Sequence, residues 1–533
     1  MRDYIYDLET YKNFFSAVIA DVENRKIYSF EISDRKDQKE MLIQFLRTVK
    51  KNNGRMVGFN NIGFDYPILH FLLRNQGAGY EELYDKAQEI IETFNSDDKF
   101  KHLIPSWKML IPQLDLFKIH HFDNKARATS LKVIEFNMRS DNIEDLPYNP
   151  HYDLTDSQKD EVLAYNKHDV LETHKFYEHS LDQIRFREKL TDQLGKDMMN
   201  HNDGKIGKDY FIMKLEESMP GCCYKKVGGK KKINQTKRSS IDLNDCILPY
   251  VQFERPEFQA VKDWLCRQSI SETKGVFNDI KEHDLGELAN YAEMVQKNKK
   301  LKSEPSEKEV KQFKKENPSC WVEKRELKSG KEVWYLCWRI AENLNTVVDG
   351  FRYDFGTGGL HGAMENRILE TTDEQLVKTY DVASYYPNLA ISNTIYPEHL
   401  GEHFCEIYED VYQQRKSYPK GTPENAMMKL ALNSVYGDSN NQYSPFYDPK
   451  YTMTITVSGQ LSLCMMAEML LKVETVQMAI VNTDGLEFLV HPDKEDEAHE
   501  VCQEWERITG LELEGDTYKK LCIANVNNYI GVT

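Results

Sequence analysis

The alternation of apolar and polar residues divides the chain into regions of different secondary structure. In residues 1–185, short apolar runs such as YIYDLET and MVGFNN alternate with helical patterns around Ile68–Arg74 and Thr155–Ile184. This alternation predicts an α/β domain. From residue 341 onward, apolar strands surround a helix-rich middle. There the stretch QMAIVNTDGLEFLV (Gln477–Val490) predicts two short strands joined by a tight turn.

Two charged segments lie between these regions. Gly221–Ser240 contains seven cations and no acid, and it predicts a connector. A solvated loop and a nucleic-acid-binding strip both remain open for it. Gln296–Ser319 is rich in lysine and glutamate, which predicts an exposed insertion with no core-forming content. We assign no chemistry to this insertion.

The composition indicates a globular protein whose cysteines are expected to be reduced. The 533 residues, 40% apolar and 29% charged, predict about three or four domains. No run approaches the ~20 apolar residues that cross a bilayer, and MRDYIYDLET has no signal pattern, so we expect a cytoplasmic location. Ten cysteines without a C-x-x-C spacing favour a reducing compartment and disfavour zinc. The net charge of −17 would normally disfavour nucleic acid, but its distribution matters more than its sum.

Four acids and a tyrosine form the first candidate site. Asp7 and Glu9 are two apart on a predicted strand, so their carboxylates face the same side. Asp65 follows another apolar strand, and Tyr165 and Asp169 share one helical face. Carboxylates kept together repel one another unless cations neutralise them. Together the four acids could hold two Mg²⁺ ions that activate water and stabilise a departing 3′ oxygen.

This order of motifs resembles the DnaQ-like (DEDD) 3′→5′ exonucleases, which have an RNase H-like fold. Tyr165, with Ala164 where the sister subtype carries histidine, indicates the tyrosine subtype, in which the tyrosine orients the attacking water. By resemblance to proofreading domains, four residues would contact single-stranded DNA: Asn61, Phe64, Ser130 and Leu131. Phe64 taken alone would more often be a core residue.

The second candidate site depends on residues of the C-terminal half. Asp381 ends an apolar strand, and Asp484 occupies a turn, where a lone acid is usually only a turn former. Lys429, Asn433 and Tyr436 have spacings of four and seven on an amphipathic helix that Gly437 is expected to end. Considered by itself, Tyr436 would be interpreted as a core residue, and Lys429 as a solvated charge on the helix surface. Facing a triphosphate, Lys429 would neutralise phosphate oxygens.

Taken together, these segments resemble a family B (alpha-like) DNA polymerase of bacteriophage type. DVASYYP matches motif A, KLALNSVYG motif B and NTDG motif C, and the resemblance runs from Tyr4 to about Tyr529. It implies a right-hand palm and fingers after the exonuclease domain. It also implies two Mg²⁺ ions in each active site, with Mn²⁺ as a possible substitute.

The resemblance also implies roles for single residues. The metal ligands would be Asp381, Asp484 and the backbone of Val382. Tyr386 matches the steric gate that rejects a ribose 2′-hydroxyl. The incoming triphosphate would be held by Arg415, Lys429 and Asn433. The DNA contacts would be Gly358 and Gly359 on the template, Tyr436 at the nascent base pair, and Tyr529 on the primer.

Two positions depart from the family pattern. Asn482 stands where motif C usually has its first acid, which predicts retained chemistry with weaker metal affinity. Asn527 stands at the lysine position of the Lys-x-Tyr element, and the thumb that follows this element in relatives is expected to be absent. We therefore expect a separately encoded thumb-bearing or processivity subunit, or else a truncated enzyme of low processivity.

The sequence thus predicts an α/β and α+β multidomain protein. Its expected parts are an exonuclease domain (1–190), a basic linker (191–240), the N-terminal part of the palm with an insertion near 296–319 (241–400), fingers (401–440) and the C-terminal part of the palm (441–533). The expected function is template-directed DNA synthesis with 3′→5′ proofreading in phage replication, in the host bacterial cytoplasm. Its partners would be primer–template DNA, dNTPs and a replicative helicase, with no membrane. The alternatives are an exonuclease with an inactive polymerase half and a noncatalytic DNA-binding scaffold.

Overall fold

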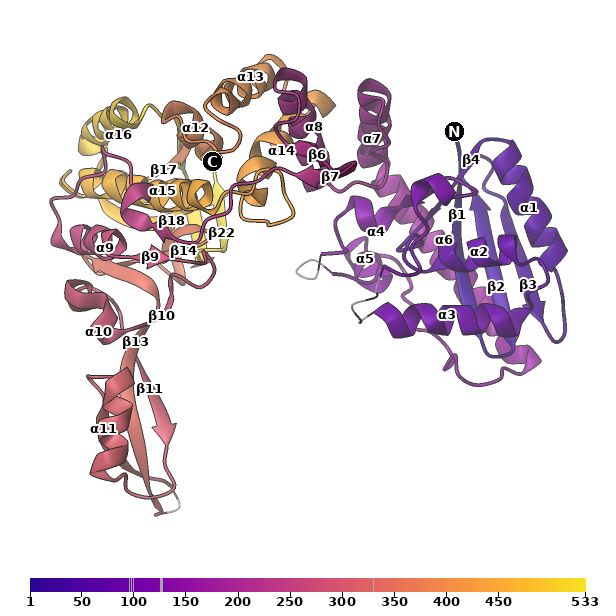
Figure 1. The fold of residues 1–533 in the computed structure, drawn as a ribbon, viewed down its shortest axis with the longest axis horizontal. Helices are drawn as coiled ribbons and strands as arrows, with labels where there is room; N and C mark the ends of the chain where they lie inside the picture. Colours follow the sequence, from indigo (N-terminus) through magenta and orange to yellow (C-terminus); the bar gives the residue numbers. More distant parts are fainter. Residues whose placement is uncertain (95, 97, 99, 125–127, 329) are drawn as a thin grey trace. The chain divides into compact units, whose positions relative to one another are not determined.

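The structure is a computed structural model of residues 1–533, and it describes residues 1–94, 96, 98, 100–124, 128–328 and 330–533. The chain forms two compact units, Met1–Ile206 and Gly207–Thr533 (Figure 1). The first unit extends beyond residue 190 because Arg187, fully buried, binds the residues that follow. Its guanidinium donates to the carbonyl oxygen of His201 at 2.9 Å and to the carboxylate of Asp203 at 2.8 Å.

A five-stranded mixed sheet forms the centre of the first unit. Its order is β3-β2-β1-β4-β5, and β1 pairs antiparallel with β2 and parallel with β4. The strands are β1 (Arg2–Tyr11), β2 (Phe14–Asp21), β3 (Ile27–Ser33), β4 (Gly54–Gly58) and β5 (Gln113–Asp115). Since β1 has neighbours on both sides, its side chains alternate between two buried faces.

Helices cover both faces of this sheet. They are α1 (Lys39–Lys51), α2 (Asp65–Arg74), α3 (Tyr80–Phe94), η1 (Ser106–Lys108), α4 (Leu116–Ile119), α5 (Leu131–Asn137), α6 (Asp156–His179) and α7 (Leu181–Leu194). Tyr4, Tyr6 and Leu8 of β1 share a core with residues of α1, α2 and α3. On the opposite face, Ile5 shares a core with Val170 of α6. Asp7 and Glu9 have the same parity as Ile5, so they lie on the face that α6 covers.

A long antiparallel sheet forms the centre of the second unit. Its order is β10-β13-β14-β15-β18-β19-β17-β20. The strands are β10 (Asn278–Lys281), β13 (Glu332–Val348), β14 (Phe351–Gly356), β15 (Gly359–Ala363), β17 (Leu376–Val382), β18 (Gln477–Asn482), β19 (Gly485–Val490) and β20 (Leu513–Tyr518). The predicted hairpin over Gln477–Val490 is confirmed as β18 and β19. A small sheet of β16 (Arg367–Glu370), β21 (Lys520–Asn525) and β22 (Asn528–Val532) shares apolar contacts with it, and β8 (Ile241–Asp242) pairs with β9 (Ser269–Ile270).

The remaining helices pack around this sheet. They are α8 (Asp203–Ser218), which begins in the first unit, η2 (Leu243–Cys246), α9 (Pro256–Cys266), α10 (Glu282–Leu285), η3 (Gly286–Asn290), α12 (Tyr385–Ser392), α13 (His403–Ser417), α14 (Pro423–Asp438), α15 (Pro449–Leu470), η4 (Pro492–Lys494) and α16 (Glu495–Thr509). By length and composition α15 could cross a membrane, which the sequence analysis did not expect. Most of its residues are buried inside the unit, so α15 is a core helix.

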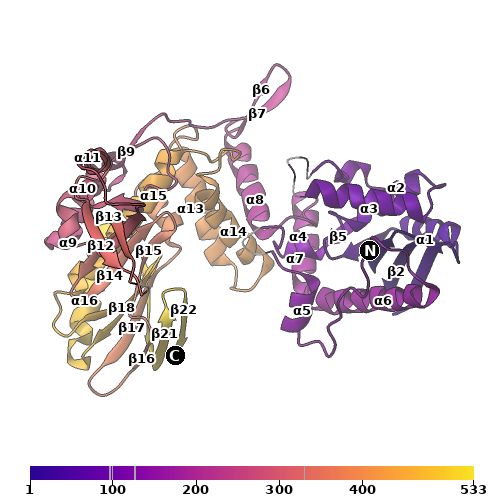
Figure 2. The same cartoon turned by 90° about the horizontal axis from the view of Figure 1, so that it is seen from below.

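The basic segment predicted as a connector contains a hairpin. Strands β6 (Tyr224–Val227) and β7 (Lys230–Ile233) pair antiparallel through a Gly228-Gly229 turn, and both glycines have positive φ. Figure 2 shows the hairpin extending away from the helices of its unit. Its lysines are exposed, and Lys231 lies 3.7 Å from the ring centroid of Tyr224. Thus the lysines are carried on a paired ribbon.

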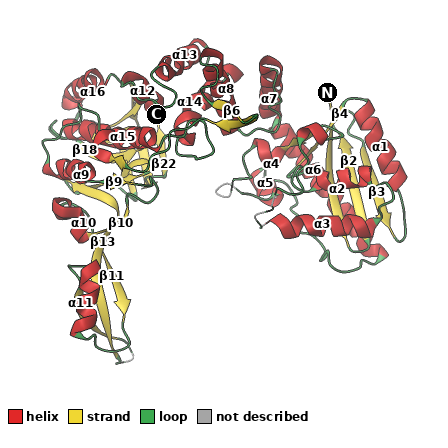
Figure 3. Cartoon of the chain, viewed as in Figure 1, coloured by secondary structure: helices red, strands yellow, loops and turns green. Residues whose placement is uncertain are grey.

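The segment Gln296–Ser319, predicted as an exposed insertion with no core-forming content, is regular in secondary structure, and its helix has no buried residue. The segment forms β11 (Val295–Lys300) and α11 (Glu307–Glu316), and with β12 (Trp321–Glu326) these pack on the extension of β13 (Figure 3). Phe313 of α11 meets Trp338 of β13 edge-on, with ring centroids 5.4 Å apart. The apolar partners come from the strand that follows the segment, so the segment's own composition gave no sign of them.

Candidate active sites

Three predicted acids of the first unit come together in one group. Asp7 and Glu9 of β1 and Asp169 of α6 each offer a carboxylate oxygen, and these oxygens all lie within 4.8 Å of one another. Burial, followed by the charges of neighbouring acids, raises the pKa of Asp7 and of Glu9 well above the ordinary range. Such a group holds negative charge at a cost that a divalent cation would relieve.

Asp65 lies at the edge of this group. It is the first residue of α2, and its side chain is only 5% exposed. Burial raises its pKa to about 8, and its charge in turn raises the pKa of Asp7 and Glu9. The loop before it is held by Asp115, a buried acid that sequence reasoning missed. Its carboxylate accepts the backbone N–H groups of Asn60 and Ile62 at 2.9 and 3.2 Å.

Tyr165 and Asn166 of α6 hold the carboxylates in place. The Tyr165 hydroxyl hydrogen-bonds the carboxylate of Asp169, whose pKa burial raises to about 6. Asn166, also missed by sequence reasoning, donates its amide N–H to Asp7 at 2.6 Å. It adjoins Tyr165 in the sequence, so the motif pointed to the helix but not to this amide.

The four predicted single-strand contacts differ in exposure. Asn61 is fully buried and donates to the side-chain oxygen of Gln113 at 3.0 Å, while its own amide oxygen has no partner among the described residues. Phe64 is half-buried against the core shared with α2. Ser130 caps α5 by accepting the N–H of Val133, and Leu131 is the first residue of that helix. Their predicted contact with DNA stays a prediction.

Most of the polymerase residues predicted from the sequence line one cavity of the second unit. This cavity measures about 970 Å³. The predicted residues in its wall are Asp381, Val382, Tyr386, Arg415, Lys429, Asn433, Tyr436, Asp484 and Tyr529. Gly358 and Gly359 are not among its lining residues, although the hydroxyl of Tyr386 donates to the carbonyl oxygen of Gly358 at 3.4 Å.

Strand pairing brings the two acids of this cavity together. Asp381, the penultimate residue of β17, pairs with Gly485 of β19, and an added Cβ at Gly485 would lie 1.9 Å from the Asp381 carboxylate. Glycine therefore follows Asp484 because any side chain would displace Asp381. In addition, the N–H of Val382 donates to the carbonyl oxygen of Asp484 at 2.7 Å. The adjoining Thr483 has a φ of 56°, a left-handed conformation rare for a β-branched residue.

The electrostatics of this acid pair resemble those of the first site. Asp381 and Asp484 both have exposed side chains at the mouth of the cavity. Partial burial by the cavity walls, followed by the charges of Asp484 and Glu514, raises the pKa of Asp381 to about 6. Burial also raises the pKa of Asp484. Glu514, missed by sequence reasoning, lies opposite Asp381 on β20, so it adds a third carboxylate to the cavity wall.

The predicted cations also line this cavity. Arg415 near the end of α13 donates to the hydroxyl of Ser384 at 2.9 Å, which holds the guanidinium beside the Asp381 loop. Lys429 and Asn433 of α14 are both exposed into the cavity. The helix α14 extends to Asp438, one residue beyond the predicted end at Gly437.

Three neighbouring tyrosines also line the cavity: Tyr385, Tyr386 and Tyr436. Tyr386 lies 4.3 Å from Tyr436 and 5.5 Å from Tyr385, measured between ring centroids. Tyr436 is fixed by a 2.8 Å hydrogen bond between its hydroxyl and that of Thr456. Both rings are therefore held in position.

The departure at Asn482 is accommodated by local hydrogen bonds. Its amide oxygen accepts the Thr483 hydroxyl at 3.2 Å, and its amide N–H donates to the carbonyl oxygen of Val526 at 3.4 Å. An aspartate here could not donate to Val526. Asn482 thus ties the turn to the strand pair β21–β22.

A buried carboxyl group lies near these acids. Glu487 of β19 is 2% exposed, and one of its carboxylate oxygens has no hydrogen-bond partner among the described residues. Burial, together with the charges of Asp381 and Asp484, raises its pKa to about 8. Its sequence signal was a single acid in the apolar strand GLEFLV.

We expect Glu487→Gln to stabilise the second unit at pH 8.5 but not at pH 4.5. Between these values the folded carboxyl keeps a proton that the unfolded chain releases, so stability falls as pH rises toward 8. Glutamine has no proton to lose, so it removes this loss of stability. At pH 8.5 the expected gain in the free energy of unfolding is roughly 2–3 kcal/mol after the cost of burying an amide. Denaturant unfolding with EDTA at both pH values measures it, and Glu474→Gln, at an exposed site, is the control. A pH-independent difference between wild type and variant would contradict this account of Glu487.

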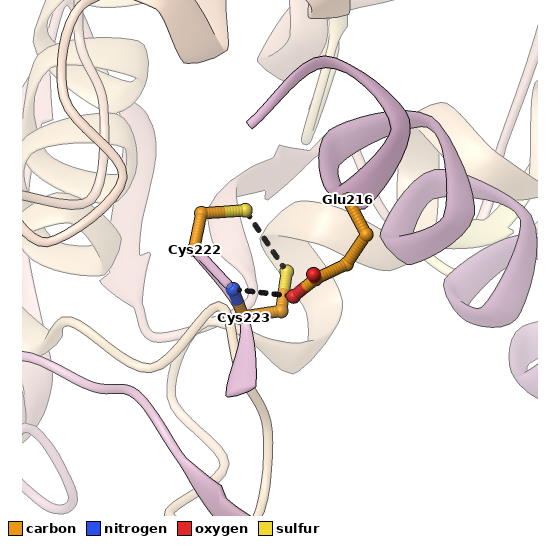
Figure 4. A group of neighbouring side chains, drawn as sticks. All are labelled: Glu216, Cys222 and Cys223. Carbon is orange, nitrogen blue, oxygen red and sulfur yellow. Dashed lines mark hydrogen bonds between the residues drawn. The ribbon is translucent and has the colours of Figure 1, made fainter. Parts of the chain in front are cut away.

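A third group of possible ligands has a structural explanation. Glu216 of α8 lies beside Cys222 and Cys223, whose sulfur atoms are 3.6 Å apart (Figure 4). The Glu216 carboxylate accepts the backbone N–H groups of Gly221, Cys223 and Tyr224 at 2.7–3.2 Å. Since these bonds use the carboxylate lone pairs, Glu216 anchors the base of the β6–β7 hairpin. The ten cysteines are all free thiols.

Comparison with known proteins bears on the first unit. Residues 9–128 match the family model of a predicted 3′–5′ exonuclease related to the exonuclease domain of PolB. No curated protein matches the chain. Among solved structures, the chain is similar to the family B DNA polymerase of the hyperthermophilic archaeon Pyrobaculum calidifontis, with 13% identity and a TM-score of 0.46. That similarity covers 100% of this chain and 58% of the archaeal polymerase chain. The family match thus indicates an exonuclease-related domain in the first unit.

Proposed function

We propose that this chain is a template-directed DNA polymerase of family B, bacteriophage type, with a 3′→5′ proofreading exonuclease. The observation that carries the polymerase half is the cavity of about 970 Å³ whose lining includes three acids, four cations and neighbouring tyrosines. Asp381, Arg415 and Lys429 come from three different elements, so their convergence is not a consequence of local sequence. The exonuclease half is supported by the acid group and by the family match of residues 9–128.

The acid groups fit divalent cations of the Mg²⁺ type, which prefer oxygen ligands. Asp7, Glu9, Asp65 and Asp169 would hold such ions in the exonuclease site. Asp381, Asp484 and the carbonyl of Val382 would hold them in the polymerase site. With two ions in each site, or with Mn²⁺ as a substitute, the bound metal would supply Lewis-acid activation of the attacking oxygen and neutralise the leaving group.

The chain's own residues then position the substrates. In the polymerase cavity, Arg415 and Lys429 would neutralise the triphosphate, and Asn433 would add a polar contact. Tyr436 would contact the nascent base pair, and Tyr529 would contact the primer. In the exonuclease site, the hydroxyl of Tyr165, oriented by its hydrogen bond to Asp169, would orient the attacking water.

Primer extension tests the proposal. The full chain is incubated with a primed template, dNTPs and Mg²⁺, and products longer than the primer are expected. The same primer without dNTPs is expected to shorten from its 3′ end. Shortening without any extension would favour the alternative, an exonuclease with an inactive polymerase half.

We expect Tyr386→Val to raise incorporation of ribonucleotides relative to deoxyribonucleotides by roughly 10–100-fold. The Tyr386 ring is held against Tyr436, and by its match to the steric-gate position of motif A it would exclude a ribose 2′-hydroxyl. Single-nucleotide incorporation with rNTP and dNTP gives the ratio of kcat/KM values. Tyr443→Val, at an exposed tyrosine, is the control. If Tyr386→Val discriminated between rNTP and dNTP as strongly as wild type, Tyr386 would not be the steric gate.

The partners that accompany this function are also proposals. They are primer–template DNA, dNTPs, a thumb-bearing or processivity subunit and a replicative helicase, with activity in the cytoplasm of a host bacterium. Extension measured with and without extract of phage-infected cells would test the subunit. A longer product with extract, at equal primer use, supports it.

A further inference from the structure

The arm of the second unit, residues 295–340, has one covered and one open sheet face. β13 is its central strand, with β11 on one edge and β12 on the other. Helix α11 packs on the face that carries Trp338, and Figures 1 and 3 show it lying along these strands. Side chains of opposite parity on β13 point to the other face, where the figures draw no helix.

The open face carries aromatic rings and guanidinium groups. Tyr335 and Cys337 of β13 lie opposite Glu323 and Trp321 of β12. Arg325 lies 4.8 Å from the ring centroid of Tyr335, and Arg339 lies 5.9 Å from that of Trp321. The two aromatic side chains are half-buried, so part of each ring remains accessible. Arrays of this kind offer π-faces beside positive charge.

The arm is basic in an acidic chain. Residues 295–340 contain thirteen lysines and arginines and seven acids, a net charge of +6, whereas the whole chain carries −17. The remainder therefore carries −23. The cations of the arm are thus a local concentration of positive charge that attracts a polyanion.

A pocket beside the open face gathers three of these cations. It measures about 390 Å³, and its wall contains Lys300, Lys302, Lys331, Trp334 and one acid, Glu332, which forms an ion pair with Lys324. Lys300 projects to the open face because it pairs with Tyr335 across the strands. None of the three lysines forms an ion pair with a described residue. A phosphate could enter without breaking an existing salt bridge between described residues.

We propose that this open face, with the lysine pocket, binds single-stranded DNA. Exposed bases would stack on Trp321 and Tyr335, and the phosphates would contact Lys300, Lys302, Lys331 and Arg339. Unpaired bases fit better than a duplex because stacking on side chains requires free base faces. The assignment goes beyond the polymerase and exonuclease sites and does not rest on either activity.

The test measures binding of the full chain to a fluorescein-labelled oligo(dT) by anisotropy, in EDTA to prevent hydrolysis. Trp321→Ala/Tyr335→Ala is expected to raise the Kd about 10-fold or more, since stacking on an aromatic ring contributes substantially per base. Lys300→Gln/Lys302→Gln/Lys331→Gln is expected to reduce the slope of log K against log salt by about 2, because each phosphate contact contributes about 0.7.

The matched control is Lys308→Gln/Lys311→Gln/Lys315→Gln, which removes the same charge from exposed positions of α11. It is expected to leave the salt slope nearly unchanged. Wild-type Kd in the aromatic variant together with a wild-type slope in the pocket variant would overturn the proposal. An equal loss of slope in the control would also overturn it, because net charge alone would then explain binding. The pocket variant leaves the arm's packed aromatic residues intact, so it remains informative if the aromatic variant misfolds.

Discussion

Asp381→Ala is expected to lower nucleotide incorporation by about 1,000-fold or more while leaving hydrolysis of single-stranded DNA unchanged. The magnitude follows because charge neutralisation at a transferring phosphoryl group contributes several kcal/mol, and each 1.36 kcal/mol is tenfold in rate. Asp381 is positioned for such a role by Gly485, which leaves room for its carboxylate, and by the bond from Val382 to Asp484. Alanine removes one of only two motif acids at this point.

The measurement is single-turnover incorporation of one dNTP on a primed template. Asp373→Ala, an exposed acid just before β17, is the control and is expected to retain wild-type incorporation. Hydrolysis by the same preparation shows that the first unit is folded. If the incorporation rate of Asp381→Ala lay within tenfold of the wild-type rate, the cavity would not be the site of synthesis. The exonuclease-only alternative would then be favoured.

The local sequence pattern was sufficient to predict the strands that carry the motif acids. The period-two run around Asp7 and the hairpin around Asp484 are both present as β1 and β18–β19. In β1, which is regularly paired, alternation alone determines which side chains share a face, whereas the β18–β19 pair has a register shift between Met478 and Ile480. The convergence of Asp381 with Lys429 was inferred from motif order, since their elements are separated in the chain.

Residues whose role depends on tertiary contacts could not be found in this way. Glu487 reads as one polar residue in an apolar strand, and its effect depends on burial next to Asp381 and Asp484. Asp115 is the last residue of a three-residue strand, and it holds a loop that lies far from it in sequence. The composition of the insertion did not show its packing on β13, because the apolar contact is shared between α11 and β13. Composition windows measure neighbours in sequence, whereas these three features depend on neighbours in space.

Each of the two candidate sites places several carboxyl groups close together, and burial raises their pKa. Beside the effect of burial, the charges of Asp65 and Asp169 raise the pKa of both Asp7 and Glu9. In the second unit, the charges of Asp381 and Asp484 add to burial in raising the pKa of Glu487. Folding therefore works against repulsion at both sites in the absence of metal. Any ligand that neutralises these groups will stabilise the folded state by linkage.

Asp7→Asn is expected to lower hydrolysis of single-stranded DNA by about 1,000-fold while leaving incorporation of a first nucleotide unchanged. Asp7 is one of three carboxylates whose oxygens lie within 4.8 Å, so asparagine removes a charged ligand while keeping the shape of the side chain. Release of 3′-terminal nucleotides from a labelled single strand gives the rate. Asp153→Asn, at an exposed position of the same unit, is expected to behave as wild type.

A second measurement separates loss of chemistry from loss of fold. Because burial and neighbouring acids raise the pKa of Asp7, the charged form is unfavourable in the folded state, and a neutral amide is not expected to lower the Tm in EDTA at pH 8. The amide N–H of Asn166, which now donates to Asp7, can still donate to the asparagine oxygen. A variant that loses hydrolysis and keeps its Tm identifies Asp7 as part of the catalytic group. If Asp7→Asn hydrolysed single-stranded DNA at the wild-type rate, the acid group would not take part in the reaction, even though residues 9–128 match an exonuclease family.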